Sequence, residues 1–186
     1  MDTRTLPRLV AQSLGQRLRV MPAVVVTGAR QTGKSTLAQA LAPGRRRFVS
    51  LDDLDAVDMA RRDPEALVGG AQPVTLDEVQ REPDLLRAVK RAIDRRRRPG
   101  QFLLTGSANL LLMRRISESL AGRASYLTLW PMTRREQKGL GRCGLWDELL
   151  DARDEDWRDL VSAQPNDPED WRRWRAAAAF RPRPFT

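Results

Sequence analysis

The chain has 186 residues, of which 41% are hydrophobic and 31% are charged, a balance typical of a soluble globular protein with one main core. It contains no histidine and a single cysteine, which excludes an intrachain disulfide and a His/Cys zinc site, so any bound metal needs oxygen ligands. Its apolar runs are far shorter than the roughly 18 residues of a membrane span, and its N-terminus lacks the apolar core of a signal peptide. These features predict a cytoplasmic protein without a membrane segment.

The formal net charge of +9 comes from the first 142 residues, which carry 26 basic and 14 acidic groups, whereas the remainder carries 7 basic and 10 acidic groups. A basic surface attracts nucleic-acid phosphates. The run Arg95–Arg98, however, comes at the end of an expected helix, where cations stabilise the helix dipole. A nucleic-acid patch and a solvated basic face therefore both remain open.

Short apolar segments alternate with helical segments along the chain. In chain order, the pattern predicts a helix at 6–18, a strand at 23–27, a helix at 35–42, a strand at 47–51, short helices at 54–69, a strand at 73–77, a helix at 83–95, a strand at 101–106, a helix at 109–122 and a strand at 125–130. Five strands separated by helices predict an α/β fold, a three-layer sandwich with a five-stranded parallel sheet.

The segment GARQTGKS lies between the first strand and the next helix, and it has the spacing of a phosphate-binding loop, the Walker A motif of P-loop NTPases. In such a loop, backbone N–H groups and the N-terminus of the helix converge on phosphate. The predicted nucleotide-binding residues are Gly28, Ala29, Arg30, Gln31, Thr32, Gly33, Lys34, Ser35 and Thr36.

Lys34 is unusual because only three of the 33 basic residues are lysines. An ammonium and a guanidinium are not interchangeable in a tight pocket, so a lysine at this position favours a phosphate contact over chance. We expect Lys34 to reach the β- and γ-phosphates of ATP and the Ser35 hydroxyl to bind Mg²⁺.

An apolar strand ends in Asp77 and Glu78, the pattern of a Walker B motif. Ligands of α/β proteins bind at the carboxyl ends of the strands. We expect Asp77 to hold Mg²⁺ and Glu78 to polarise an attacking water. The alternative is an acidic pair that caps the next helix.

Thr105 lies at the end of the fourth strand and is the expected sensor of the γ-phosphate, whereas Ser107 suits either that role or the N-cap of the next helix. Arg123 is a candidate to neutralise transition-state charge, in its own chain or on a neighbouring subunit, and a solvated arginine is the alternative. Asp52 and Asp53 are expected to cap a helix rather than bind metal.

The ordered segments GARQTGKSTL, FVSLDD, TLDEVQREPDLLRAVKRAID, FLLTGSANLLL and SLAGRASYLTLWPMTRREQ resemble prokaryotic AAA-type ATPases in which the ATPase domain precedes a domain of unknown function. The resemblance covers residues 20–140. It implies binding and hydrolysis of ATP, and a sheet in which the Thr105 strand lies between the loop strand and the Asp77 strand.

We expect residues 1–141 to form the ATPase domain with a leading amphipathic helix. Residues 142–186 are acidic and rich in tryptophan, and they look like the start of an incomplete second domain, so that the chain looks truncated after the ATPase domain.

The functional hypothesis is an ATP-binding protein that hydrolyses ATP with Mg²⁺ to drive a conformational change. A DNA partner, a protein partner and a homo-oligomer remain open. The alternatives are a small-molecule P-loop kinase and a non-catalytic nucleotide switch or truncated remnant. Glu78 directly after Asp77 favours the ATPase.

Overall fold

The structure, a computed structural model, describes residues 6–41, 45–107, 116 and 118–140. The chain divides into two units, Met1–Arg142 and Cys143–Thr186. All of the second unit and most of the helix expected at 109–122 lie outside the described residues.

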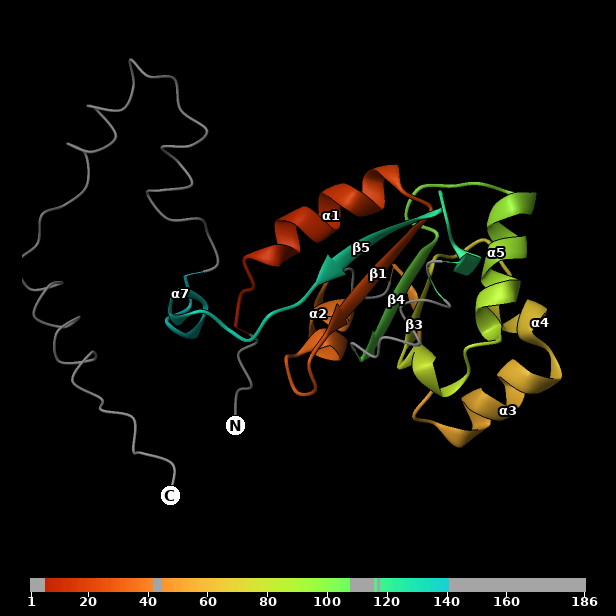
Figure 1. Ribbon diagram of the computed structural model, residues 1–186, viewed down its shortest axis with the longest axis horizontal. Helices are drawn as coiled ribbons and strands as arrows, with labels where there is room; N and C mark the ends of the chain where they lie inside the picture. The colour runs from red at the N-terminus through yellow and green to blue at the C-terminus, as the bar shows by residue number, and fades with distance from the viewer. Residues whose placement is uncertain (1–5, 42–44, 108–115, 117, 141–186) are drawn as a thin grey trace, which may run out of the picture. The chain divides into compact units, whose positions relative to one another are not determined.

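Within the described part of the chain, the strands form one parallel sheet in the order β2-β3-β4-β1-β5 (Figure 1). Their bounds are β1 Ala23–Gly28, β2 Arg47–Ser50, β3 Val74–Asp77, β4 Phe102–Ser107 and β5 Ala124–Thr128. The predicted α/β fold with a five-stranded parallel sheet is confirmed, as is the position of the Thr105 strand between the loop strand and the Asp77 strand.

A helix before the first strand and helices α2 to α5 between the strands agree with the sequence prediction, whereas the short helix α7 after β5 was not predicted. Their bounds are α1 Val10–Val20, α2 Lys34–Ala40, α3 Leu54–Arg62, α4 Pro64–Val68, α5 Leu85–Arg95 and α7 Arg134–Gln137, with a short 3₁₀ helix, η1, at Val79–Arg81. Asp63 follows the last residue of α3 and is also the N-cap of α4, since its carboxylate accepts a hydrogen bond from Ala66 N. Pro64 is the first residue of α4, a position that suits proline. No helix among the residues described above is both long and apolar enough to cross a membrane.

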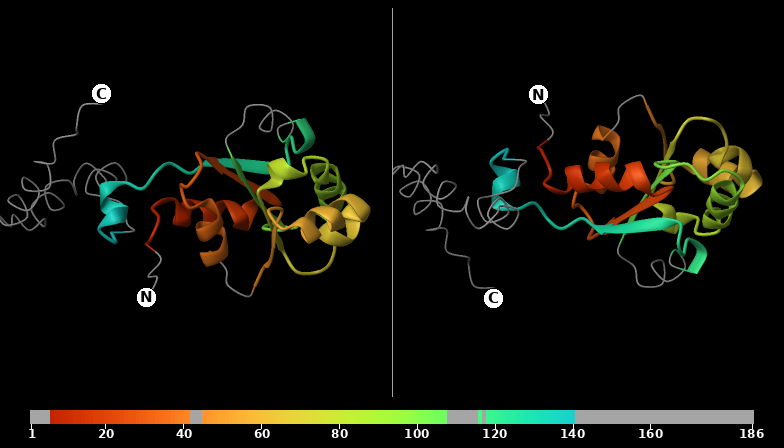
Figure 2. Two further views of the ribbon diagram at one scale, coloured as in Figure 1. Left: turned by 90° about the horizontal axis from the view of Figure 1, so that it is seen from below. Right: turned by 90° about the horizontal axis from the view of Figure 1, so that it is seen from above.

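Both faces of the sheet are covered, which explains why β1 is apolar at successive positions. Val25 packs in the core that includes α3, α4 and α5, whereas Val24 and Val26 pack in the core that includes Leu14 of α1 and Leu37 of α2. In Figure 2, α1 and α2 lie together, apart from the group formed by α3, α4 and α5. A strand that is buried on both faces needs an apolar residue on each, so the alternating pattern of a half-exposed strand is absent.

The strand register brings the functional segments to one edge of the sheet. Gly28 pairs with Ser107 at the ends of β1 and β4, and Leu76 pairs with Leu104 in β3 and β4. Because the strands are parallel, the residues that follow Leu76 and Leu104 lie side by side. Asp77 and Thr105 are therefore adjacent, next to the loop that leaves β1.

At the opposite edge, Arg46 joins the starts of two strands. Its guanidinium donates to Thr75 Oγ1 at 3.1 Å, to Val74 O at 2.8 Å and to Gly100 O at 2.5 Å. Burial lowers the pKa of Arg46 to about 10, so it is protonated at neutral pH. Arg46 therefore stabilises the sheet and lies away from the phosphate loop.

Candidate nucleotide-binding site

Two glycines shape the loop between β1 and α2. Gly28 ends β1 with φ +155°, and a Cβ at this position would collide with the carbonyl oxygen of Leu129. Gly33 is the N-cap of α2 in the left-handed conformation, with φ +86°, which costs little only for glycine. The backbone therefore requires glycine at both of the positions that the motif predicts.

Lys34 is the first residue of α2, and its side chain folds back across the loop. Its Nζ donates to Ala29 O at 2.8 Å and to Gly28 O at 3.2 Å, and the residue is only 6% exposed. The ammonium is therefore held at the start of the loop, beside the backbone N–H groups at the N-terminus of α2.

Three of the predicted residues meet at one carboxylate. Ser35 Oγ donates to Asp77 Oδ1 at 3.0 Å, and Thr105 Oγ1 donates to the same oxygen. Asp77 and Thr105 are both buried. Although the three residues belong to α2, β3 and β4, the sheet order brings them into direct contact.

Glu78 occupies a strained backbone position beside this cluster. Its φ is +58°, and among the described residues only Gln31 is another non-glycine residue with positive φ. Such conformations concentrate at functional sites because they cost free energy that the fold has to supply elsewhere. Gln80 Nε2 donates to Glu78 Oε2, and Gln80 Oε1 accepts from Ser107 N at 3.2 Å. Gln80 thus links Glu78 to the end of β4.

A polar cavity of about 670 Å³ opens on the Lys34 side of the loop. Glu78 and Gln31, the two strained residues, both line it. Its full lining is Arg30, Gln31, Lys34, Asp52, Glu78, Gln80, Arg81 and Ser107. The cavity therefore joins the loop to the predicted catalytic carboxylate.

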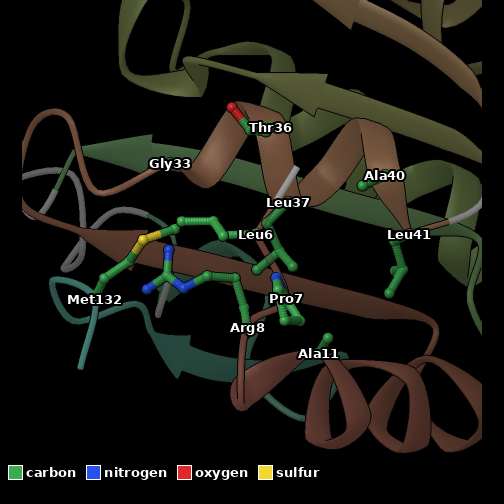
Figure 3. A pocket seen from close by; sticks show the side chains of 10 residues that line it. All are labelled: Leu6, Pro7, Arg8, Ala11, Gly33, Thr36, Leu37, Ala40, Leu41 and Met132. Atoms are coloured by element: carbon green, nitrogen blue, oxygen red, sulfur yellow. The ribbon is translucent and has the colours of Figure 1, made fainter. Parts of the chain in front are cut away.

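A second pocket, of about 610 Å³, lies on the other side of the loop and is mostly apolar (Figure 3). It is lined by Leu6, Pro7, Arg8, Ala11, Gly33, Thr36, Leu37, Ala40, Leu41 and Met132. Gly33 belongs to this pocket and its neighbour Lys34 to the polar cavity. The N-terminus of α2 thus separates an apolar pocket from a polar one.

The other predicted positions are placed as follows. Asp53 caps α3 by accepting from Asp55 N at 3.0 Å, as expected. Asp52 lines the polar cavity and forms an ion pair with Arg81. An N-cap role for Ser107 would involve residues outside the described part of the chain.

Arg123 requires a correction. It directly precedes β5, and its carbonyl accepts from Ala23 N, at the start of β1 and therefore at the edge of the sheet opposite the loop. Its side chain pairs with Asp94, with Nε–Oδ1 2.6 Å and Nη2–Oδ2 3.1 Å. This hydrogen bonding raises the pKa of Arg123 and lowers the pKa of Asp94. The prediction that Arg123 neutralises transition-state charge in its own chain is therefore wrong, and the same role on a neighbouring subunit stays a prediction.

Sequence reasoning missed Gln80 and Arg8, the second of which lines the apolar pocket. Gln80 follows Glu78 by two residues in VQR, and nothing in that pattern marks its contact with β4. Arg8 is one of many arginines in the chain, so composition gave no signal for it.

The profile of the AAA domain family matches residues 21–138, which include the loop, Asp77, Glu78 and Thr105. The chain belongs to the AAA domain family. Two uncharacterized proteins, from Mycobacterium bovis and Mycobacterium tuberculosis, are each 37% identical to it over 142 residues. The match covers 75% of this chain and 32% of each relative, so the chain spans about a third of the length of these relatives.

A solved structure, a Walker-type ATPase of Pyrococcus abyssi, has the same fold. It aligns with a TM-score of 0.50 and 16% identity, covering 88% of this chain and 67% of the ATPase. Membership of the AAA family and this fold together support a P-loop domain that binds a nucleotide.

Replacing Lys34 with Ala tests the loop assignment. Removing a cation that is expected to contact two phosphates should weaken ATP binding by at least about 100-fold, since each hydrogen bond to a charged group contributes roughly 1.5–3 kcal/mol. Isothermal titration calorimetry on the folded variant measures the change. Lys90→Ala, at an exposed position of α5, is the matched control and should bind as the wild type does. Unchanged affinity in Lys34→Ala would refute the assignment.

Proposed function

We propose that this protein hydrolyses ATP with Mg²⁺ and that hydrolysis drives a conformational change. The observation that carries the proposal is the shared carboxylate of Asp77, which accepts from Ser35 in the loop helix and from Thr105 in β4. Glu78 follows it directly and lines the cavity that also contains Lys34. The residues that we propose to bind phosphate, hold the metal and activate water are therefore neighbours.

The chemistry of Ser35 and Asp77 fits Mg²⁺. The ion prefers oxygen ligands, keeps several waters and needs few protein ligands when it also binds phosphates. Ser35 Oγ and Asp77 Oδ1 are such oxygens, at the N-terminus of α2. Mg²⁺ bound there would neutralise part of the phosphate charge.

We assign the general base to Glu78. Its left-handed backbone turns the chain out of β3 at the end of the strand, and Gln80 contacts its carboxylate. A carboxylate fixed in this way beside the loop suits the activation of one water molecule. Gln80 also contacts Ser107 N, so a movement of Glu78 would reach the end of β4.

Thr105 is the proposed sensor. Its hydroxyl is fully buried and donates to Asp77. A change in the charge or position of the phosphate and metal near Asp77 would alter this hydrogen bond, and β4 would transmit the change to the sheet. This is the conformational step that we attach to hydrolysis.

The apolar pocket is the proposed site of the nucleobase. A base is planar and largely apolar, and this pocket shares Gly33 and Thr36 with the start of the loop helix. A nucleotide whose phosphates lie at the N-terminus of α2 can therefore place its base among Leu6, Pro7 and Met132 (Figure 3).

The partner on which the cycle acts is a DNA, a protein or a second copy of the chain. Arg95 pairs with Glu65 at 2.8 Å, Arg97 donates to Gly122 O at 2.9 Å and Arg98 donates to Ala71 O at 3.2 Å. These contacts favour a structural role for the basic run over a nucleic-acid patch.

Glu78→Gln should separate binding from chemistry. The amide keeps the volume of Glu78 but cannot deprotonate water, so we expect near-normal ATP affinity and hydrolysis slowed by at least about 100-fold, the lower range of general-base effects. Single-turnover cleavage and equilibrium binding measure the two properties.

The matched control is Asp52→Asn, which removes one carboxylate charge from the same cavity and should retain most of the cleavage rate. Equal cleavage by Glu78→Gln and wild type would exclude Glu78 as the base. A parallel loss of binding would assign it a structural role.

Ala40→Trp tests the nucleobase pocket. Ala40 is exposed and lines the pocket, so a bulky side chain fills the space without disturbing the core. ATP affinity should fall by about 10-fold or more, equivalent to roughly 1.4 kcal/mol, whereas inorganic tripolyphosphate should bind as before. Gln39→Trp, exposed on the same helix but outside the pocket lining, is the control. Equal ATP affinity in both variants would place the base elsewhere.

A further inference from the structure

Arg8 joins three segments that are far apart in the sequence. Its Nη1 donates to Thr32 O at 2.6 Å, its Nη2 to Trp130 O at 2.7 Å and its Nε to Glu136 Oε1 at 3.0 Å. Thr32 belongs to the phosphate loop, Trp130 follows β5 and Glu136 lies in α7. Figure 3 shows the guanidinium of Arg8 extending toward the side of the pocket that holds Met132.

Glu136 is a fixed partner for Arg8. It is only 3% exposed, its Oε2 accepts from Thr133 N at 2.7 Å and its Oε1 also accepts from Leu9 N at 2.8 Å. Burial alone would raise the pKa of Glu136, but the N–H groups of Thr133 and Leu9 and the guanidinium of Arg8 together lower it. The ion pair is therefore charged at neutral pH, and it connects the segment before α1 to the capping box of α7.

The contact with Thr32 has a direct consequence for the loop. A trans peptide group is planar, so its N–H points away from its C=O. Because Arg8 holds the oxygen of Thr32, the N–H of Gly33 points away from Arg8. Gly33 is a glycine in the left-handed conformation, and a glycine peptide rotates easily without such a restraint. A charged donor on the oxygen also polarises the peptide and strengthens its N–H as a donor.

We propose that Arg8 is a positioning residue of the phosphate loop, which orients the Gly33 N–H toward phosphate and links the loop to α7 through Glu136. The inference rests on the proposed nucleotide binding. A phosphate that accepts a hydrogen bond from the Gly33 N–H strengthens the hydrogen bond between Arg8 and Thr32 O. Because coupling between two sites is reciprocal, the ordering of α7 in turn strengthens phosphate binding.

Arg8→Lys tests the proposal in the full 186-residue chain. A lysine keeps the charge but has one nitrogen, which cannot replace the planar fork that serves three acceptors. Calorimetric titration should show about 10-fold weaker binding of both ATP and inorganic tripolyphosphate, the loss expected when a charge-assisted contact is removed. Both ligands should weaken because Arg8 orients the Gly33 N–H, which serves the phosphate that ATP and tripolyphosphate share.

Arg17→Lys is the matched control. Arg17 also ties α1 to β5, through Ser125 Oγ at 2.5 Å and Tyr126 O at 3.2 Å, but these contacts lie away from the loop. The affinity of the Arg17→Lys variant for ATP and for tripolyphosphate should stay within about twofold of the wild type, as expected for a substitution away from the binding site. Similar losses in Arg8→Lys and Arg17→Lys would reduce the effect to general packing of α1 and overturn the proposal.

Hydrogen exchange supplies the readout for the link to α7. The amides of Glu136 and Gln137 donate to the Thr133 side chain and carbonyl, and ATP should slow their exchange in the wild type and in Arg17→Lys but not in Arg8→Lys. Unchanged α7 exchange in the wild type with bound ATP overturns the link, and wild-type affinity in Arg8→Lys overturns the positioning role. A wild type that binds no ATP overturns the proposed function as well.

Should Arg8→Lys fail to fold, Glu136→Gln carries the test. The amide keeps the volume and one acceptor oxygen, but it removes the charge that holds Arg8. Protection of α7 by ATP should be lost and tripolyphosphate should bind more weakly, by about threefold or more, because the neutral partner forms a weaker hydrogen bond. Wild-type protection and affinity in this variant overturn the proposal.

Discussion

One buried carboxylate oxygen, Asp77 Oδ1, accepts hydrogen bonds from Ser35 and Thr105 and so joins the loop helix, β3 and β4. A buried charge that lacks donors is costly, because burial removes it from water. These two hydroxyls lie within reach only when β3 and β4 are neighbours and α2 starts at the same edge. The candidate metal site therefore forms only with this order of strands.

The loop is held from both of its sides. Gly28 packs against the backbone at Leu129, where a Cβ would collide with the carbonyl oxygen, and Arg8 donates to Thr32 O. The backbone that follows β5 therefore supports the loop along with the segment before α1. The N-terminus of α2 lies between the polar cavity and the apolar pocket, and a nucleotide that spans it would use both.

The sequence predicted the elements that have a local pattern. The strand, loop and helix around Lys34 are continuous in the chain, and the apolar run that precedes the loop is typical of a strand buried on both faces. The segment before Asp77 was predicted as a strand, and it is buried at every position. The family resemblance predicted that the Asp77 and Thr105 strands are neighbours, whereas the direct contact between their side chains was not predicted. Glu78 was predicted as a carboxylate at the strand end, but its left-handed backbone has no signature in the residue type.

The remaining features depend on contacts between distant side chains. Arg8 and Glu136 are 128 residues apart, and no periodicity or composition connects them. Arg123 illustrates the reverse case, because its position before a strand was suggestive while the parallel register carries it to the opposite edge of the sheet. A chain with this many arginines offers many such candidates, and only the fold distinguishes anchors from ligands of phosphate.

We propose that these groups hydrolyse ATP by transfer of the γ-phosphoryl group to water. The most direct measurement is orthophosphate release from Mg·ATP by the full chain with no small-molecule acceptor, with and without DNA. We predict orthophosphate over several turnovers that stops when Mg²⁺ is chelated. ATP that binds but yields no orthophosphate would identify a non-catalytic switch, and phosphate that moves only to an added small acceptor would identify a kinase. Either result would exclude the proposed hydrolysis of ATP.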